Sequence, residues 1–173
     1  MKTTRVLVLD FDNCIVLNER TRTGSEEAKD EAWFRVFPEY DKDKLEAVLK
    51  VMRQEIAGGK GDRKDIAEAI FRHFGRPDAE IAGEVARRCE AFNAVTQDSV
   101  KRIGVSRRAI VALSEFSLLM PIYVNTATPI EAIVESLKLL KIEHFFKGVY
   151  GRPGTKLDNL KAIITLEAVT PAE

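Results

Sequence analysis

The sequence has 173 residues, 45% of them hydrophobic, which is long enough and apolar enough to fold around a core and argues against disorder. Its 27 lysines and arginines balance its 27 aspartates and glutamates, so its charge gives no reason to expect nucleic acid or a membrane surface as partner. The two cysteines have no C-x-x-C spacing, and neither a signal peptide nor a bilayer-spanning stretch is found, so we expect a cytoplasmic protein without a disulfide scaffold.

The first predicted element is a strand at residues 6–9, Val-Leu-Val-Leu. This continuous run of β-branched and aliphatic residues is typical of a strand that is buried on both faces of a parallel sheet.

Residues 18–97 predict helices and no strand. Ser25, followed by two glutamates, begins a helix that Pro38 ends. Apolar residues at helical spacing indicate three more helices, at residues 45–56, 66–74 and 81–92. We expect these helices to form a separate cap that is inserted after the first strand.

The remaining chain alternates helices and strands. Ser106 is expected to cap a helix, strands are predicted at residues 122–124 and 148–150, and Thr128 is expected to cap the helix between them. A helical pattern also follows Lys156. This order predicts right-handed βαβ units and an α/β fold with a Rossmann-like parallel sheet. We assign residues 1–17 and 98–173 to this core and residues 18–97 to the all-helical cap.

Two carboxylates, Asp10 and Asp12, follow the first predicted strand. Ligands of open α/β sheets bind at the carboxyl ends of the strands. One carboxylate could attack phosphorus while the other acts as general acid and then base. Two close negative charges also favour a bound cation, and their oxygen ligands suit Mg²⁺. Taken alone, an Asp-x-Asp pair is more often a solvated acidic turn.

Thr126 and Lys156 follow the other two predicted strands. A hydroxyl before a helix N-terminus suits a phosphate, because free N–H groups and the positive end of the helix dipole lie there. A lysine that enters a helix from a Gly/Pro-rich loop can hold an anion. Each residue alone also fits an ordinary role, as a turn residue or as a solvated surface lysine.

Together the segments around Asp10, Thr126 and Lys156 resemble the first three sequence motifs of the haloacid dehalogenase superfamily. They are Leu-Asp-Phe-Asp-Asn at 9–13, Val-Asn-Thr-Ala-Thr-Pro at 124–129 and Gly-Arg-Pro-Gly-Thr-Lys at 151–156. Asn13 and Cys14 stand where glycine and threonine are more usual. The helical insert is similar to the cap of the phosphoglycolate phosphatase and β-phosphoglucomutase branch.

The resemblance implies roles for the motif residues. Asp10 would be the nucleophile that forms an aspartyl-phosphate, and Asp12 the general acid/base. The Asp10 carboxylate and the Asp12 carbonyl would bind Mg²⁺. The transferring phosphoryl group would be held by Thr126, Ala127 and Lys156, where positioning and charge neutralisation supply most of the catalysis.

A substrate contact is expected in the predicted cap. In the related branch a glycine-bearing cap loop with a basic residue approaches the substrate, and residues 58–64, Gly-Gly-Lys-Gly-Asp-Arg-Lys, are similar. Arg63 is therefore a candidate substrate contact, with a plain interhelical turn as the alternative.

The leading functional hypothesis is a magnesium-dependent phosphatase of small phosphorylated metabolites. The alternatives are a phosphomutase of the same fold, a receiver-type signalling domain, and a remnant without turnover. A receiver domain needs a further aspartate at the end of a middle strand. Residues 18–97, where that strand would lie, predict helices instead, which disfavours the receiver. Cys14 and Arg20 have the C-x5-R spacing of cysteine phosphatases, but the apolar residues between them suit a phosphate loop poorly, so Cys14 is interpreted as a packing residue.

The family's fourth motif, one or two aspartates that usually follow a glycine and complete the magnesium site, has no counterpart here. No Gly-Asp pair occurs between Lys156 and Glu173. We expect the chain to be a fragment of a longer protein, with a naturally degenerate protein as the alternative. In the family, the missing strand lies beside the first one. We therefore expect an exposed sheet edge, and a chain that is poorly stable alone or forms a homodimer.

Overall fold

The computed structural model describes residues 5–56 and 61–170. They divide into two compact units. One, the α/β unit, comprises the described residues of Met1–Glu26 and Ser99–Glu173, and the other, the helical unit, comprises the described residues of Glu27–Asp98.

A parallel sheet forms the centre of the α/β unit. Its strands are β1 (Leu7–Leu9), β2 (Ile122–Pro129) and β3 (Gly148–Arg152), in the order β1-β2-β3. The α/β fold with a parallel sheet is therefore confirmed. β1 was expected to be buried on both faces, and this was wrong, because the three residues of β1 are only partly buried. Among the described strands β1 pairs only with β2, so one of its edges has no neighbouring strand.

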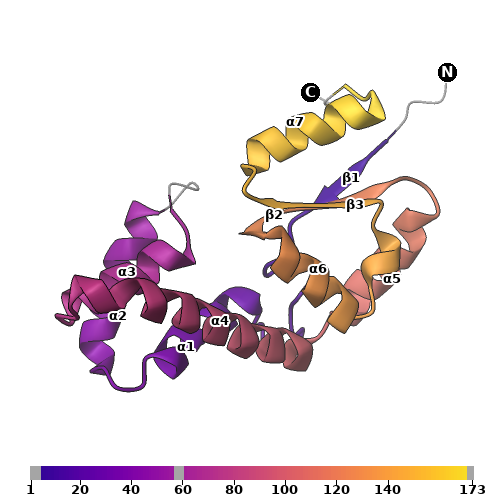
Figure 1. Cartoon of the computed structure of the whole chain (residues 1–173). Helices are drawn as coiled ribbons and strands as arrows, with labels where there is room; N and C mark the ends of the chain where they lie inside the picture. The colour runs from indigo at the N-terminus through magenta and orange to yellow at the C-terminus, as the bar shows by residue number, and fades with distance from the viewer. Residues whose placement is uncertain (1–4, 57–60, 171–173) are drawn as a thin grey trace. The chain divides into compact units, whose positions relative to one another are not determined.

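Helices cover both faces of this sheet. Figure 1 shows α7 (Lys156–Glu167) on one face and α5 (Arg107–Ser117) and α6 (Ile130–Leu139) on the other. A short 3-10 helix, η2 (Glu143–Phe145), precedes β3. The core between the sheet and α5 and α6 is made by Phe11, Ile15, Val16, Val100, Leu113, Ile122, Val124, Ile133, Leu137 and Ile142.

A polar cluster holds the end of α7 against the sheet. The buried Tyr123 hydroxyl donates to the Glu167 carboxylate, and Lys147 Nζ lies 2.6 Å from Glu167 Oε1. Burial and the nearby carboxylate raise the pKa of Tyr123 to about 12. The hydrogen bonds from Lys147, which has the larger effect, and from Tyr123 lower the pKa of the Glu167 carboxyl. The cluster thus joins β2 to the last turn of α7.

The helical unit contains most of α1 (Ser25–Val36), α2 (Lys42–Glu55), α3 (Arg63–His73) and most of α4 (Asp78–Ile103). Asp41 and Asp62 cap α2 and α3, and Asp62 forms a reciprocal capping box with Asp65. The core of the unit is aromatic, since the ring of Trp33 lies 4.3 Å from that of Phe92. The segment assigned to the cap is therefore helical wherever it is described, apart from its connecting loops.

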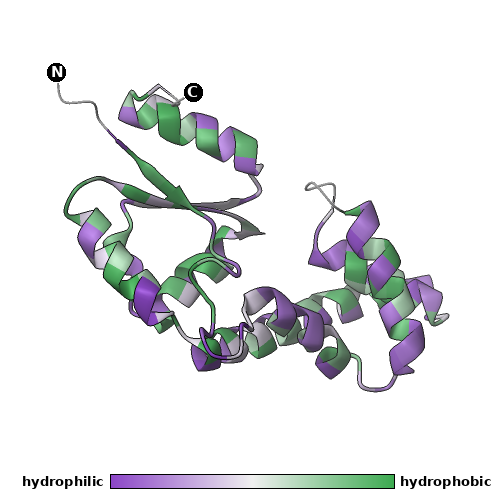
Figure 2. Cartoon of the chain, turned by 180° about the vertical axis from the view of Figure 1, so that it is seen from behind, coloured by the Kyte–Doolittle hydropathy of each residue, from purple (hydrophilic) through white to green (hydrophobic). Residues whose placement is uncertain are grey.

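α4 is longer than its apolar pattern indicated, because it continues through polar residues to Ile103. Figure 2 shows hydrophilic and hydrophobic residues mixed along this helix. Among the described residues, no helix is both long enough and apolar enough to cross a membrane.

Candidate active site

The two aspartates lie where β1 ends. Phe11, between them, is 1% exposed and belongs to the core of the α/β unit, whereas Asp10 and Asp12 are partly exposed. Because neighbouring side chains of an extended segment point to opposite sides, burying Phe11 directs both carboxylates away from the core. The Phe11 N–H donates to Asp10 Oδ1 at 2.8 Å, which fixes that carboxylate close to the backbone.

Lys156 contacts the first of these carboxylates. Its Nζ lies 2.6 Å from Asp10 Oδ2, although 146 residues separate the two in sequence. The two side chains are 48% and 42% exposed, so the ion pair contributes only about 0.2–1 kcal/mol to folding. The contact is therefore better understood as placing a cation at Asp10 than as stabilising the fold.

A buried amide network holds the loop that carries Lys156. Asn125 Nδ2 donates to the Lys156 carbonyl at 2.9 Å, and Asn159 Nδ2 donates to Asn125 Oδ1 at 3.2 Å and to the Gly151 carbonyl at 3.4 Å. A Cβ at Gly154 would lie 2.2 Å from Asn159 Oδ1, so only glycine permits this approach. Thr155 caps α7 by accepting from the Asp158 N–H at 3.1 Å, which makes Lys156 the first residue of the helix.

Asp12 is held by two hydroxyl groups. Ser25 Oγ donates to Asp12 Oδ1 at 2.7 Å, and Thr128 Oγ1 donates to Asp12 Oδ2 at 3.0 Å. The prediction that Thr128 caps α6 was wrong: Pro129 occupies the N-cap position, no side chain caps the helix, and β2 extends through Thr128. The Thr128 hydroxyl binds the carboxylate instead.

Thr126 is 1% exposed and lies on β2, two residues before Thr128. Its Oγ1 accepts a hydrogen bond from the Thr128 N–H at 3.2 Å, and the hydroxyl proton of Thr126 can still be donated. The carbonyl of the exposed Ala127 accepts from Arg152 Nε at 3.1 Å. The structure thus links Asp12, Thr128 and Thr126 by hydrogen bonds, and links Asp10 to Lys156, all within the α/β unit.

Arg63, the predicted substrate contact, belongs to the helical unit. It is the first residue of α3, and its guanidinium lies 5.7 Å from the centre of the Phe92 ring. Residues 58–60 of the predicted cap loop lie outside the described residues. Contact between Arg63 and a substrate stays a prediction.

Cys14, the alternative nucleophile, has an environment that disfavours a thiolate. Burial, and then the negative charge of Asp10, raise the pKa of the Cys14 thiol above its usual range. Since the thiolate is the reactive form, a cysteine phosphatase mechanism gains no support.

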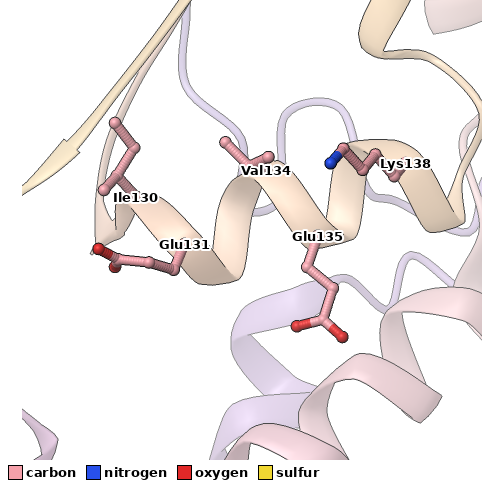
Figure 3. Close-up of a pocket in the computed structure, with 5 residues that line it drawn as sticks. All are labelled: Ile130, Glu131, Val134, Glu135 and Lys138. Carbon is pink, nitrogen blue, oxygen red and sulfur yellow. The ribbon is translucent and has the colours of Figure 1, made fainter.

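Figure 3 shows an open hollow along α6, lined by Ile130, Glu131, Val134, Glu135 and Lys138. None of the predicted site residues lines it. Ile130 and Val134 are only partly buried, and both line this hollow.

The chemistry of the donors at the end of β1 suits Mg²⁺, which prefers oxygen ligands and is commonly bound by one or two carboxylates with several waters. Both oxygens of Asp12 already accept hydroxyl groups, so its backbone carbonyl is the better donor, and the Asp10 carboxylate is the second. Among the described residues, no group of three or more His, Cys, Asp or Glu side chains could hold a metal ion. Water and substrate oxygens would have to supply the other ligands.

No protein-family model and no curated protein sequence matches this chain. Solved structures do. A putative β-phosphoglucomutase from Thermotoga maritima has a TM-score of 0.67 at 16% identity, over 97% of this chain and 73% of its own. A haloacid dehalogenase-like hydrolase from Streptococcus pneumoniae has a TM-score of 0.58 at 17% identity, and the match covers 100% of this chain and 74% of the hydrolase. The putative hydrolase YfnB from Bacillus subtilis, bound to magnesium, has a TM-score of 0.57 at 15% identity, and the match covers 87% of this chain and 66% of YfnB.

At 15–17% identity these likenesses establish the fold. The chain has the haloacid dehalogenase-like α/β fold with a helical cap, as its motifs predicted. It spans about two thirds to three quarters of the length of the three solved chains. The similar structures also include 2-haloacid dehalogenases, so the fold alone leaves the reaction open.

Proposed function

We propose that this chain carries the reaction centre of a magnesium-dependent phosphatase that acts on small phosphorylated metabolites through an aspartyl-phosphate. The observation that carries the proposal is the pairing of Lys156 Nζ with Asp10 Oδ2 at 2.6 Å, beside a second carboxylate, Asp12, whose orientation two hydroxyl groups fix. The proposed nucleophile Asp10, the Lys156 cation and the proposed general acid/base Asp12 thus lie at the carboxyl edge of one sheet.

In the proposed reaction, a carboxylate oxygen of Asp10 attacks the phosphorus of a phosphate monoester. The bond from phosphorus to the leaving alcohol oxygen breaks, and Asp12 gives that oxygen a proton. Asp12 then takes a proton from water, whose oxygen attacks the phosphorus. The bond from phosphorus to the Asp10 oxygen breaks, which releases inorganic phosphate and restores both carboxyl groups.

The other residues would bind the phosphoryl group. Lys156 offsets its negative charge, and Thr126 donates its hydroxyl proton from a position just before the N-terminus of α6. Mg²⁺ at the Asp10 carboxylate and the Asp12 carbonyl would neutralise further charge when bound. These groups recognise the phosphoryl group, while the rest of the substrate would be chosen elsewhere, with Arg63 as the candidate.

Dehalogenation, the reaction named for some of the similar structures, would have less need of Asp12 as a general acid. A halide leaves without a proton, so a general acid beside the nucleophile gains nothing in the first step. An alcohol leaving from phosphorus needs that proton. The second carboxylate therefore favours phosphate esters as substrates.

The proposal is tested by measuring phosphate release from a panel of phosphate monoesters with Mg²⁺, for the wild type and for Asp10→Asn. We expect turnover by the wild type and a loss on the order of a thousandfold or more in the variant, because an amide is a poor nucleophile. Asp43→Asn, at an exposed position in the first turn of α2, is the matched control and should retain full turnover. Full turnover by Asp10→Asn would refute the nucleophile, and isomerised phosphate esters without phosphate release would indicate a mutase.

A further inference from the structure

The segment after β1 is bonded to the first turn of α1 at three points. Ser25 Oγ donates to Asp12 Oδ1 at 2.7 Å, Glu26 N–H donates to Asn13 Oδ1 at 3.0 Å, and Asn13 N–H makes a longer contact with Ser25 Oγ at 3.4 Å. All these residues belong to the α/β unit, and Ser25 is 0% exposed. We call this set of contacts the Asn13–Ser25 clamp.

The backbone of the clamp demands particular residues. Asn13 has a φ of 53°, in the left-handed region where asparagine and glycine are tolerated better than other residues. A glycine would fit the same backbone, but it could not accept the Glu26 N–H. A Cβ on Gly24 would lie 2.0 Å from Asn13 Oδ1, so glycine at 24 leaves the space that the Asn13 side chain fills. Two unusual residue choices therefore serve the same contact.

The direction of the bond to Asp12 follows from chemistry. While Asp12 is ionised its carboxylate can only accept, so the single hydroxyl proton of Ser25 is donated to Asp12 Oδ1; each oxygen keeps a second lone pair that can take up the proton Asp12 transfers. Thr128 donates to the other oxygen of the same carboxylate. With a donor on each oxygen, the carboxylate plane of Asp12 is fixed, and Ser25, one of these donors, begins α1, the helix in which the chain enters the helical unit.

We propose that Ser25 is a positioning residue that holds the Asp12 carboxylate in the orientation for proton transfer to the leaving group, and that Asn13 holds Ser25 in place by capping the first turn of α1. This inference rests on the proposed role of Asp12 as general acid/base. Asp12 keeps its carboxyl group without the clamp, but its proton is no longer aimed at the leaving oxygen. Proton transfer by a positioned side chain contributes about 10²–10⁴-fold to a rate, and a misplaced one loses part of that.

The test exploits the leaving group. The kinetic constant kcat/KM covers the steps up to transfer of the phosphoryl group to Asp10. A p-nitrophenolate leaves with little need of a proton, whereas an alkoxide, as from glycerol phosphate, needs one. We expect Ser25→Ala to lower kcat/KM for the alkyl ester by about tenfold or more and to leave p-nitrophenyl phosphate nearly unaffected. Ser25→Thr, which keeps the hydroxyl, should restore the alkyl ester rate. Ser117→Ala, at an exposed position on α5, is the matched control and should change neither.

Asn13 is tested by a pair of variants. Asn13→Gly keeps the backbone conformation but removes the acceptor for the Glu26 N–H, while Asn13→Asp keeps the acceptor. We expect Asn13→Gly to show the same selective loss on the alkyl ester, and Asn13→Asp to retain the wild-type rate. Amide hydrogen exchange by NMR should show Glu26 protected in the wild type and in Asn13→Asp, and less protected in Asn13→Gly.

The outcomes separate this inference from the proposed function. A wild type that hydrolyses neither ester would refute the proposed function, and the positioning role with it. A wild type that hydrolyses both, combined with an equal fall for both esters in Ser25→Ala or with no fall at all, would refute the positioning role alone. An unprotected Glu26 amide in the wild type would refute the clamp itself, whatever the rates.

Discussion

Asn159→Asp should destabilise the protein strongly for so small a change. The two side chains have nearly the same shape, but the carboxylate cannot donate. The variant therefore loses the hydrogen bonds from Asn159 Nδ2 to Asn125 Oδ1, at 3.2 Å, and to the Gly151 carbonyl, at 3.4 Å. An oxygen would then face two acceptor oxygens at a position that is only 8% exposed.

Two buried acceptors that lose their donor cost about 1–3 kcal/mol each. Because both bonds are long, we expect about 1–2 kcal/mol for each acceptor, a loss of about 2–4 kcal/mol in the free energy of unfolding. The change should also reach the candidate site, since Asn125 holds the Lys156 carbonyl at 2.9 Å. We therefore expect weaker binding of phosphate in the same variant.

Urea unfolding followed by circular dichroism measures the free energy directly. The matched control is Asn18→Asp, because the Asn18 side-chain oxygen accepts the N–H groups of Arg20 and Thr21, each at 3.1 Å. An aspartate can do the same, so that variant should stay within about 0.5 kcal/mol of the wild type. Equal unfolding free energies for Asn159→Asp and Asn18→Asp would refute the amide network.

Three further predictions concern other parts of the chain. Phe71→Ala, at a fully buried position of the helical unit, should lower the free energy of unfolding by about 3–5 kcal/mol. Urea unfolding followed by the fluorescence of Trp33, the only tryptophan in the sequence, measures this loss. A loss under about 1 kcal/mol, as for a surface substitution, would contradict the packing. The pKa of Tyr123 is raised to about 12, so its stabilising contribution is complete below about pH 10 and is lost as the pH rises through the raised value. The excess stability of the wild type over Tyr123→Phe should thus be smaller at pH 11 than at pH 9 (about one unit either side of the free tyrosine pKa), and a constant excess would count against the raised pKa. Cys14→Ser should keep full phosphatase turnover, because the raised pKa keeps the thiol protonated, whereas a dead variant would revive the thiol as nucleophile.

The main features of the candidate site could be predicted because they are local in sequence. Asp10, Asp12 and Lys156 follow β1 and β3, Thr126 lies in the second half of β2, and parallel strands bring their carboxyl ends to one edge. Hydrophobic spacing likewise predicted the helical insert and the order of strands and helices. These signals need only the residues next to them.

The supporting contacts could not be predicted because their partners are distant. Thr128 has the sequence of a helix cap, yet its hydroxyl binds Asp12, 116 residues away. Asn159 lies in a helical pattern that hides its contact with Asn125, 34 residues away. Ser25 was correctly predicted to begin a helix, but its hydrogen bond to Asp12 was not predicted. The one sequence signal for this contact was Asn13, which stands where the family usually has glycine.

The most direct test of the central claim, that Asp10 accepts the phosphoryl group, is to find that group on the protein. The chain would be mixed with a phosphate monoester and Mg²⁺, quenched in acid during turnover, and digested for mass spectrometry. We predict one added phosphoryl group on the peptide that contains Asp10, and its absence in Asp10→Asn. Steady phosphate release by the wild type with no phosphoryl group on that peptide, or with the group on another residue, would contradict the claim.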